Sequence, residues 1–86
     1  MALEVVVSSE PLRRLIPGMR VIVVEPRHQL YERKGTVVAT YPYKGGGIVA
    51  IDGGLEDHSS IVLQGQPYPD RTVLLPYHCR ELKPPR

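Results

Sequence analysis

Histidine and cysteine are the residues of this chain most suited to binding a metal or taking part in catalysis. His28, His58 and His78 could ligate a metal together with the single Cys79. Zinc sites space their Cys and His ligands a few residues apart, whereas His78 and Cys79 are adjacent and rarely reach one ion together. The run Asp57-His58-Ser59 contains hydrolytic residue types, but neighbours on an extended loop point in different directions and form no relay. We therefore expect no metal, no cofactor and no catalytic residue, and we expect Cys79 to be a small buried residue.

The glycine run Gly45-Gly46-Gly47 could suggest a phosphate-binding loop. Such loops need either Gly-Lys-Ser/Thr or spaced glycines at the start of a helix. Neither pattern is present, and no helical pattern follows the run. The glycines predict a hairpin turn whose backbone adopts positive φ angles.

Cationic and aromatic residues alternate in the middle of the chain, where residues 13–34 carry a net charge of +4. Cations neutralise phosphates and release counterions, and Tyr offers a stacking face to an unpaired base. If the loops meet at one rim, these residues form a nucleic-acid site; otherwise they are ordinary solvent-facing charges. The candidates for nucleic-acid binding are Arg27, His28, Tyr31, Arg33, Lys34, Tyr43 and Lys44.

Aliphatic residues occupy both faces of one predicted strand, Val21–Val24, and also the segment Val5–Val7. A small barrel buries one face of a strand, so the other face must meet the N-terminal segment or a second chain. Tyr68, held between two prolines, is a rigid aromatic of the kind that anchors interfaces. The interface candidates are Val5, Val7, Ile22, Val24 and Tyr68. The alternative is that residues 1–16 fold back over their own barrel.

Glycine and proline make up 17 of the 86 residues and are spread along the whole chain. A mean helix runs about 11–12 residues, but the longest stretches without Gly or Pro have ten. Helix bundles, coiled coils, dinucleotide-binding folds and membrane spans are therefore excluded. With 42% hydrophobic residues the chain is not disordered by composition. The sequence predicts an all-β fold.

Five or six short antiparallel strands are expected, with no long helix. The predicted strands are 19–25, 35–41, 48–52, 61–63, 72–75 and 80–83, with a 3₁₀ turn at 76–79 and a stiff loop at 65–70. We expect a single domain over residues 1–86. Residues 1–17 form an N-terminal arm or strand, 18–83 a small barrel and 84–86 a tail.

The segment Gly18-Met-Arg-Val-Ile-Val23, a polar loop, and then Lys34-Gly-Thr-Val-Val-Ala39 resembles the opening of SH3-like barrels, including KOW domains. Val73-Leu-Leu-Pro-Tyr-His-Cys-Arg-Glu-Leu82 is similar to their last strands, where a 3₁₀ turn and a closing Leu seal the barrel. The resemblance implies an SH3-like fold, and its KOW variant implies nucleic-acid binding. Type II dihydrofolate reductases share this fold, but their pore-face Val-Gln-Ile-Tyr run corresponds here to Val73-Leu-Leu-Pro-Tyr77, with Leu in place of Gln.

The first expectation for function is a non-enzymatic, homo-oligomeric protein-interaction module. A KOW-like nucleic-acid-binding domain is the alternative, and a pore-type reductase is a remote one. The single cysteine and the absence of a signal-peptide pattern indicate a cytoplasmic, reducing environment.

Overall fold

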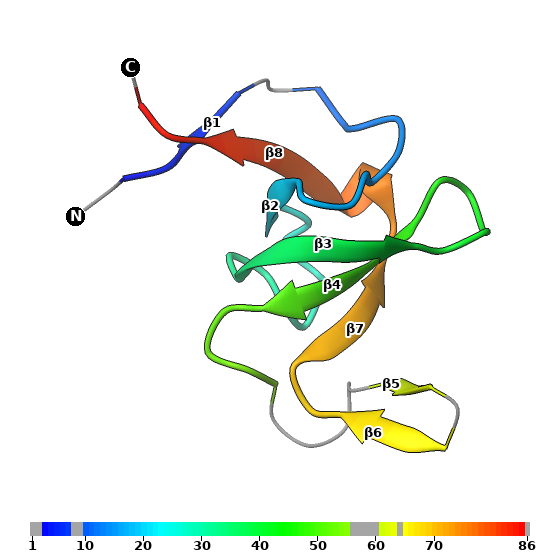
Figure 1. The fold of residues 1–86 in the computed structure, drawn as a ribbon. Helices are drawn as coiled ribbons and strands as arrows, with labels where there is room; N and C mark the ends of the chain where they lie inside the picture. Colours follow the sequence, from blue (N-terminus) through cyan, green and yellow to red (C-terminus); the bar gives the residue numbers. More distant parts are fainter. Residues whose placement is uncertain (1–2, 8–9, 56–60, 64, 86) are drawn as a thin grey trace.

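The computed structural model describes residues 3–7, 10–55, 61–63 and 65–85 (Figure 1). They form eight strands and one 3₁₀ turn, and the predicted all-β class with no long helix is confirmed. No helix in these ranges is long and apolar enough to cross a membrane. The elements are β1 (Val5–Val6), β2 (Arg20–Val23), β3 (Lys34–Thr40), β4 (Gly47–Ile51), β5 (Ile61–Leu63), β6 (Gln66–Tyr68), β7 (Arg71–Leu74), η1 (Pro76–His78) and β8 (Cys79–Lys83).

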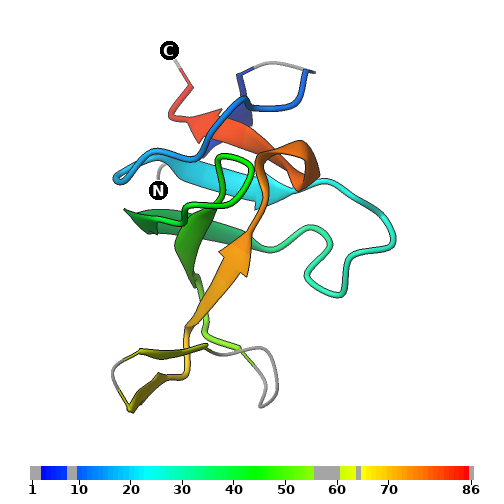
Figure 2. The same cartoon turned by 90° about the vertical axis from the view of Figure 1, so that its right-hand side faces the viewer.

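Six of these strands form one antiparallel sheet in the order β1-β8-β2-β3-β4-β7, while β5 and β6 form a separate hairpin (Figures 1 and 2). The chain leaves β7 through η1 and returns as β8, which pairs with β2 and with β1. The sheet is barrel-like but open, because its two outer strands, β1 and β7, do not pair with each other. The predicted all-β antiparallel fold is confirmed, and the barrel-like sheet is open between β1 and β7.

The core lies on one face of this sheet, where every second residue points inward. Val21 and Val23 of β2, Val37 of β3 and Val49 of β4 are each no more than 1% exposed. Leu15 packs among them from the N-terminal segment and is 1% exposed. Part of the predicted arm therefore folds back over the sheet, with Leu15 buried in the core and Leu12 partly buried against it.

The turn from β3 to β4 is a tight hairpin, as the glycine run predicted. The Gly46 amide donates to the Tyr43 carbonyl at 2.9 Å, and Lys44 and Gly45 between them have φ angles of 54° and 74°. Two positive φ angles in a four-residue turn define type I′, the form whose twist matches a hairpin. Gly47 already belongs to β4.

One expectation about the strands needs correction, and one open alternative is decided. The predicted stiff loop 65–70 contains a strand, β6, which pairs with β5; Pro67 is tolerated there because this hairpin is two-stranded and its strands are edges. The segment 3–7, left open between strand and arm, contains β1, which pairs with β8 at Val5↔Lys83 and Val6↔Leu82. The hydrolytic candidates Asp57, His58 and Ser59 lie outside the described residues.

Candidate functional site

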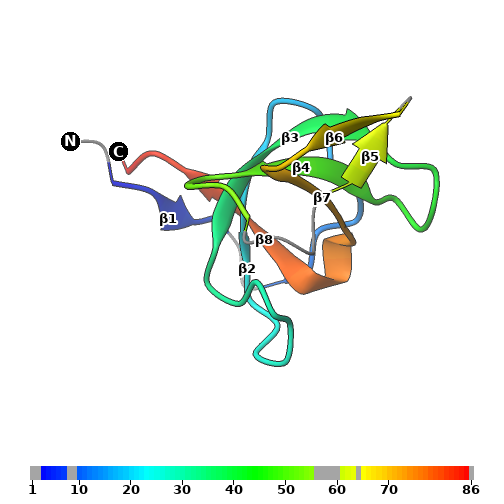
Figure 3. The ribbon, with the colours of Figure 1, turned by 90° about the horizontal axis from the view of Figure 1, so that it is seen from below.

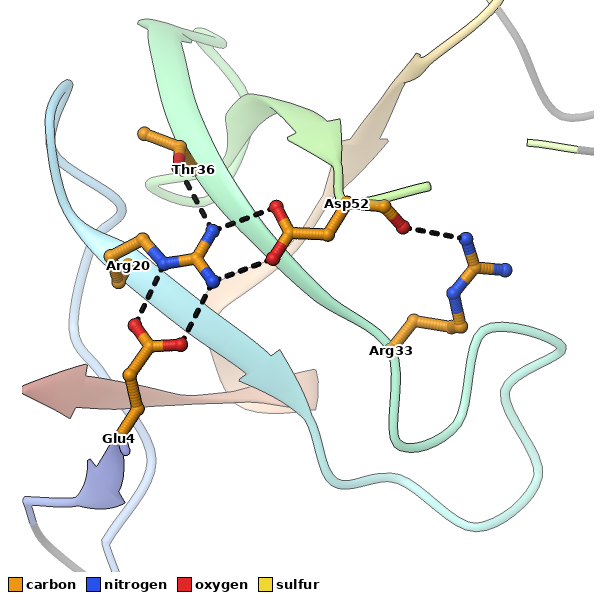
Figure 4. Close-up of polar contacts among 5 residues, drawn as sticks. All are labelled: Glu4, Arg20, Arg33, Thr36 and Asp52. Atoms are coloured by element: carbon orange, nitrogen blue, oxygen red, sulfur yellow. Dashed lines mark hydrogen bonds and ion pairs between the residues drawn. The ribbon is translucent and has the colours of Figure 1, made fainter. Parts of the chain in front are cut away.

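One arginine joins four segments on the outer face of the sheet (Figure 4). Arg20 of β2 donates from Nε and Nη2 to the two carboxylate oxygens of Glu4, at 2.8 and 2.9 Å. Its Nη1 and Nη2 donate to the carboxylate of Asp52, just after β4, at 2.8 and 2.6 Å. Nη1 also donates to Thr36 Oγ1 of β3 at 3.1 Å. Both carboxylates are thus held in the two-point geometry that suits a guanidinium.

Each ion of this cluster is hydrogen-bonded to a group of opposite charge. Hydrogen bonds from Arg20 lower the pKa of Glu4 and the pKa of Asp52, against a smaller opposing effect of burial. The same bonds raise the pKa of Arg20. Arg33 supports the arrangement by donating from Nη2 to the backbone carbonyls of Asp52, at 3.0 Å, and Gly54. A guanidinium keeps its proton near neutral pH, so Arg20 holds the segments of Glu4 and Asp52 beside β2 as a permanent cation.

The Arg20 cluster bears on function through Glu4, which immediately precedes β1. Strand β1 has only two residues, and two further contacts hold it: the Glu4–Arg20 pair and the Val7 amide, which donates to the Glu81 carbonyl at 3.0 Å. In an antiparallel pair, bonded and non-bonded residues alternate. Val5 and Val7 therefore direct their backbone groups toward β8, and Val6 directs its amide and carbonyl toward the open edge.

The open edge is apolar. Leu3 is 67% exposed, Val5 and Val6 are each 47% exposed, and Val7 is 50% exposed. An apolar strand with free backbone groups is a template for pairing with another chain. Among the described residues, this is the longest run of exposed large hydrophobic side chains along the sequence.

The predicted interface residues do not form one surface. Val5 and Val7 lie exposed on the β1 edge. Ile22 and Val24 are only partly exposed, and β8 lies between β2 and β1. Tyr68 lies in the separate hairpin, where it is partly buried and the Arg71 guanidinium sits 4.8 Å from its ring centroid. The structure therefore gathers only the N-terminal members of the predicted set.

The predicted nucleic-acid residues are divided between the two ends of β3 (Figure 3). One group lies before the strand or at its first residue: Arg27, His28, Tyr31, Arg33 and Lys34. Tyr43 and Lys44 lie in the hairpin turn after Thr40, and a seven-residue strand separates the groups by about 20 Å. These residues do not meet at one rim. Arg33 is in addition engaged with backbone carbonyls of residues 52 and 54.

A small pocket of about 190 Å³ opens beside the hairpin turn. It lies where the N-terminal segment crosses the end of β3, and its lining combines a cation, an aromatic ring and backbone. The lining residues are Arg14, Leu15, Thr40, Tyr41, Pro42, Gly45 and Gly46. Sequence reasoning missed this juxtaposition because residues 14 and 41 are distant along the chain.

The His and Cys residues within the described ranges have structural surroundings. His28 meets His78 edge to face with ring centroids 5.0 Å apart, and its Nδ1 accepts the Leu30 amide at 3.0 Å. Burial, then the neighbouring His78, lowers the pKa of His28. Cys79 is fully buried, as expected, and burial raises its pKa to about 12. In the described part of the chain, no three His, Cys, Asp or Glu residues are grouped to hold a metal ion.

Comparison with known proteins gives no match: no protein-family model, no curated protein and no solved structure is significantly similar to the chain. The fold is therefore defined by the structure itself, as an open antiparallel sheet with a barrel-like curl. Of the run compared with the reductases, Leu74 is buried in the core at 1% exposure and Tyr77 is 52% exposed in η1.

Proposed function

We propose that this protein is a non-enzymatic interaction module that self-associates through β1, and that its open sheet belongs to the SH3-like class. The observation that carries the proposal is the apolar β1 edge, where the register with β8 directs the Val6 backbone amide and carbonyl away from β8. The Glu4–Arg20 pair holds this edge in an extended conformation before any partner arrives. Less ordering entropy is then lost on binding, which favours association.

The partner that fits this edge best is a second copy of the same chain. A two-fold axis through Val6 places Val5 opposite the partner subunit's Val7, and Val7 opposite the partner subunit's Val5. Cross-strand pairs of β-branched residues stabilise antiparallel sheets. The only charge in the run Leu3–Val7 is Glu4, and its carboxylate is already paired with Arg20, so like charges do not oppose the pairing.

The strength of this contact follows from its size. About five residues from each chain meet, far fewer than the roughly 20–30 per side of a standard interface. We therefore expect association in the micromolar range. It should show as a concentration-dependent rise in weight-average mass.

Sedimentation across the micromolar range tests the proposal with two matched variants. Val5→Lys places a charge on the edge, a change that natural edge strands use against pairing. Val38→Lys makes the same change at a residue that is 38% exposed on β3, a strand paired on both sides. We expect dimers of the parent chain and of Val38→Lys, and monomers of Val5→Lys. A strictly monomeric parent chain, or equal loss in both variants, would contradict the proposal.

A further inference from the structure

A second surface lies around the turn that joins β3 to β4. We name it the hairpin patch and define it as Arg13, Arg14, Tyr41, Tyr43 and Lys44. The N-terminal segment reaches this turn because the Leu15 amide donates to the Gly45 carbonyl at 2.9 Å and the Leu15 side chain is buried. Gly45 packs so closely that a Cβ there would lie 2.8 Å from the Arg13 carbonyl. The two arginines are therefore fixed beside the turn by their backbone.

The three cations of the patch project into solvent without carboxylate partners in the described structure. Arg13, Arg14 and Lys44 are exposed, and none of them takes part in the ion pairs found among the described residues. This contrasts with Arg20, which binds two carboxylates. Three uncompensated positive charges beside one turn attract an anion with several negative charges.

Aromatic rings accompany these cations. Tyr41 is 39% exposed and Tyr43 is 54% exposed, with the Lys44 ammonium 5.4 Å from the Tyr43 ring centroid. The pocket of about 190 Å³ lies between the two kinds of group, with Arg14 and Tyr41 in its lining. A flat, unpaired base can stack on an aromatic ring or on a guanidinium plane. Duplexes keep their bases stacked on one another, so exposed rings favour a single strand.

We propose that the hairpin patch binds single-stranded nucleic acid, with Arg13, Arg14 and Lys44 on phosphates and Tyr41 and Tyr43 on bases. The site differs from the one that the sequence predicted. It keeps Tyr43 and Lys44 and gains Arg13, Arg14 and Tyr41. It excludes the predicted residues before β3 and at its first position. It also lies apart from the β1 edge, so it is independent of the proposed self-association.

Titration of a fluorescently labelled oligothymidylate and the matching oligouridylate with the full chain tests this site. Each phosphate neutralised on a single strand contributes about −0.7 to the slope of log K against log salt. Three contacts therefore predict a slope of about −2. Replacing Arg13, Arg14 and Lys44 together by Gln should bring the slope near zero, whereas Lys at both arginine positions should retain most of it.

The stacking contribution is tested separately. Tyr43→Ala and Tyr41→Ala should each weaken binding at least about fivefold with the salt slope unchanged. The matched control is Arg27→Gln with Tyr31→Ala, which removes a cation and an exposed ring at the opposite end of β3 and should leave affinity unchanged. Val5→Lys should also leave it unchanged. Thermal unfolding of each variant verifies that the fold is retained.

These titrations distinguish binding at the hairpin patch from binding elsewhere and from general attraction to polyanions. Absence of binding at low salt would overturn the proposal, and so would loss of binding in the Arg27→Gln, Tyr31→Ala control alone. The proposal would also be overturned if neither tyrosine substitution weakened binding and heparin competed as well as the oligonucleotides do. That result would identify the patch as a general polyanion site. Loss in the patch variants alone, with an effect of the tyrosines, would support it.

Discussion

The buried anchor of the N-terminal segment offers the sharpest test of the fold. Leu15 is 1% exposed and packs in the core, while the next residue, Ile16, is 51% exposed. Replacing Leu15 by Ala removes three carbons, worth about 2.4 kcal/mol at about 0.8 kcal/mol per buried methylene. The cavity left behind raises the cost to about 3–4 kcal/mol. Ile16→Ala makes a comparable change at the surface and should cost no more than about 0.5 kcal/mol.

Chemical denaturation measures both free energies of unfolding, and thermal unfolding gives a second reading. For a domain of this size about 1 kcal/mol corresponds to roughly 4–8 °C in Tm, so Leu15→Ala should lower Tm by at least about 12 °C. Small domains have only about 5–15 kcal/mol in total, so the loss is a large part of the whole. Equal effects of the two substitutions would refute the packing of Leu15 against the sheet, and with it the position of the hairpin patch.

Three other predictions concern glycine, histidine and cysteine. A Cβ at Gly35 would lie 2.6 Å from the Ala50 carbonyl oxygen, which is backbone and cannot move aside, so Gly35→Ala should cost at least about 2 kcal/mol in denaturant titration. Burial and then His78 lower the pKa of His28 below 6.5 in the folded state. The unfolded chain then binds more protons, and stability should fall as pH drops below about 6.5. His28→Asn retains an acceptor for the Leu30 amide and should flatten that fall; an unchanged pH profile would contradict this reasoning. The Cys79 thiol, with its pKa raised to about 12 and no exposed surface, should react with a thiol reagent only as fast as the protein unfolds, and rapid labelling at neutral pH would contradict the burial.

Local patterns predicted the strands because turn-forming Gly and Pro residues and the alternation of apolar residues act over only a few positions. Gly18 precedes β2, Gly35 is the second residue of β3, and Pro76 begins the 3₁₀ turn. Val21, Val23 and Val37 point inward, as their spacing indicates. The strand β6 was missed because Pro67 within it and Pro69 just after it favour a loop. Its pairing with β5 is a contact between segments and leaves no local signal.

The candidate sites were harder to predict because they depend on which ends of strands meet. The residues around His28 and those around Lys44 looked like one group because a short stretch of sequence separates them, yet that stretch is mostly the extended β3. The Arg20 cluster joins residues 16 and 32 positions apart. Neither Glu4 nor Asp52 has a sequence feature that marks it as a partner of Arg20.

The open sheet has two edge strands, β1 and β7, and they differ in exposure. At β1 the side chains are apolar and about half exposed, whereas no residue of β7 is exposed and Pro76 follows two residues after it. Pairing of β1 with β1 is isologous and closes after two copies, while pairing of β1 with β7 would be head-to-tail and would give a ring or an open filament. Under the proposed self-association, the lower exposure of β7 favours a finite pair over continued head-to-tail growth.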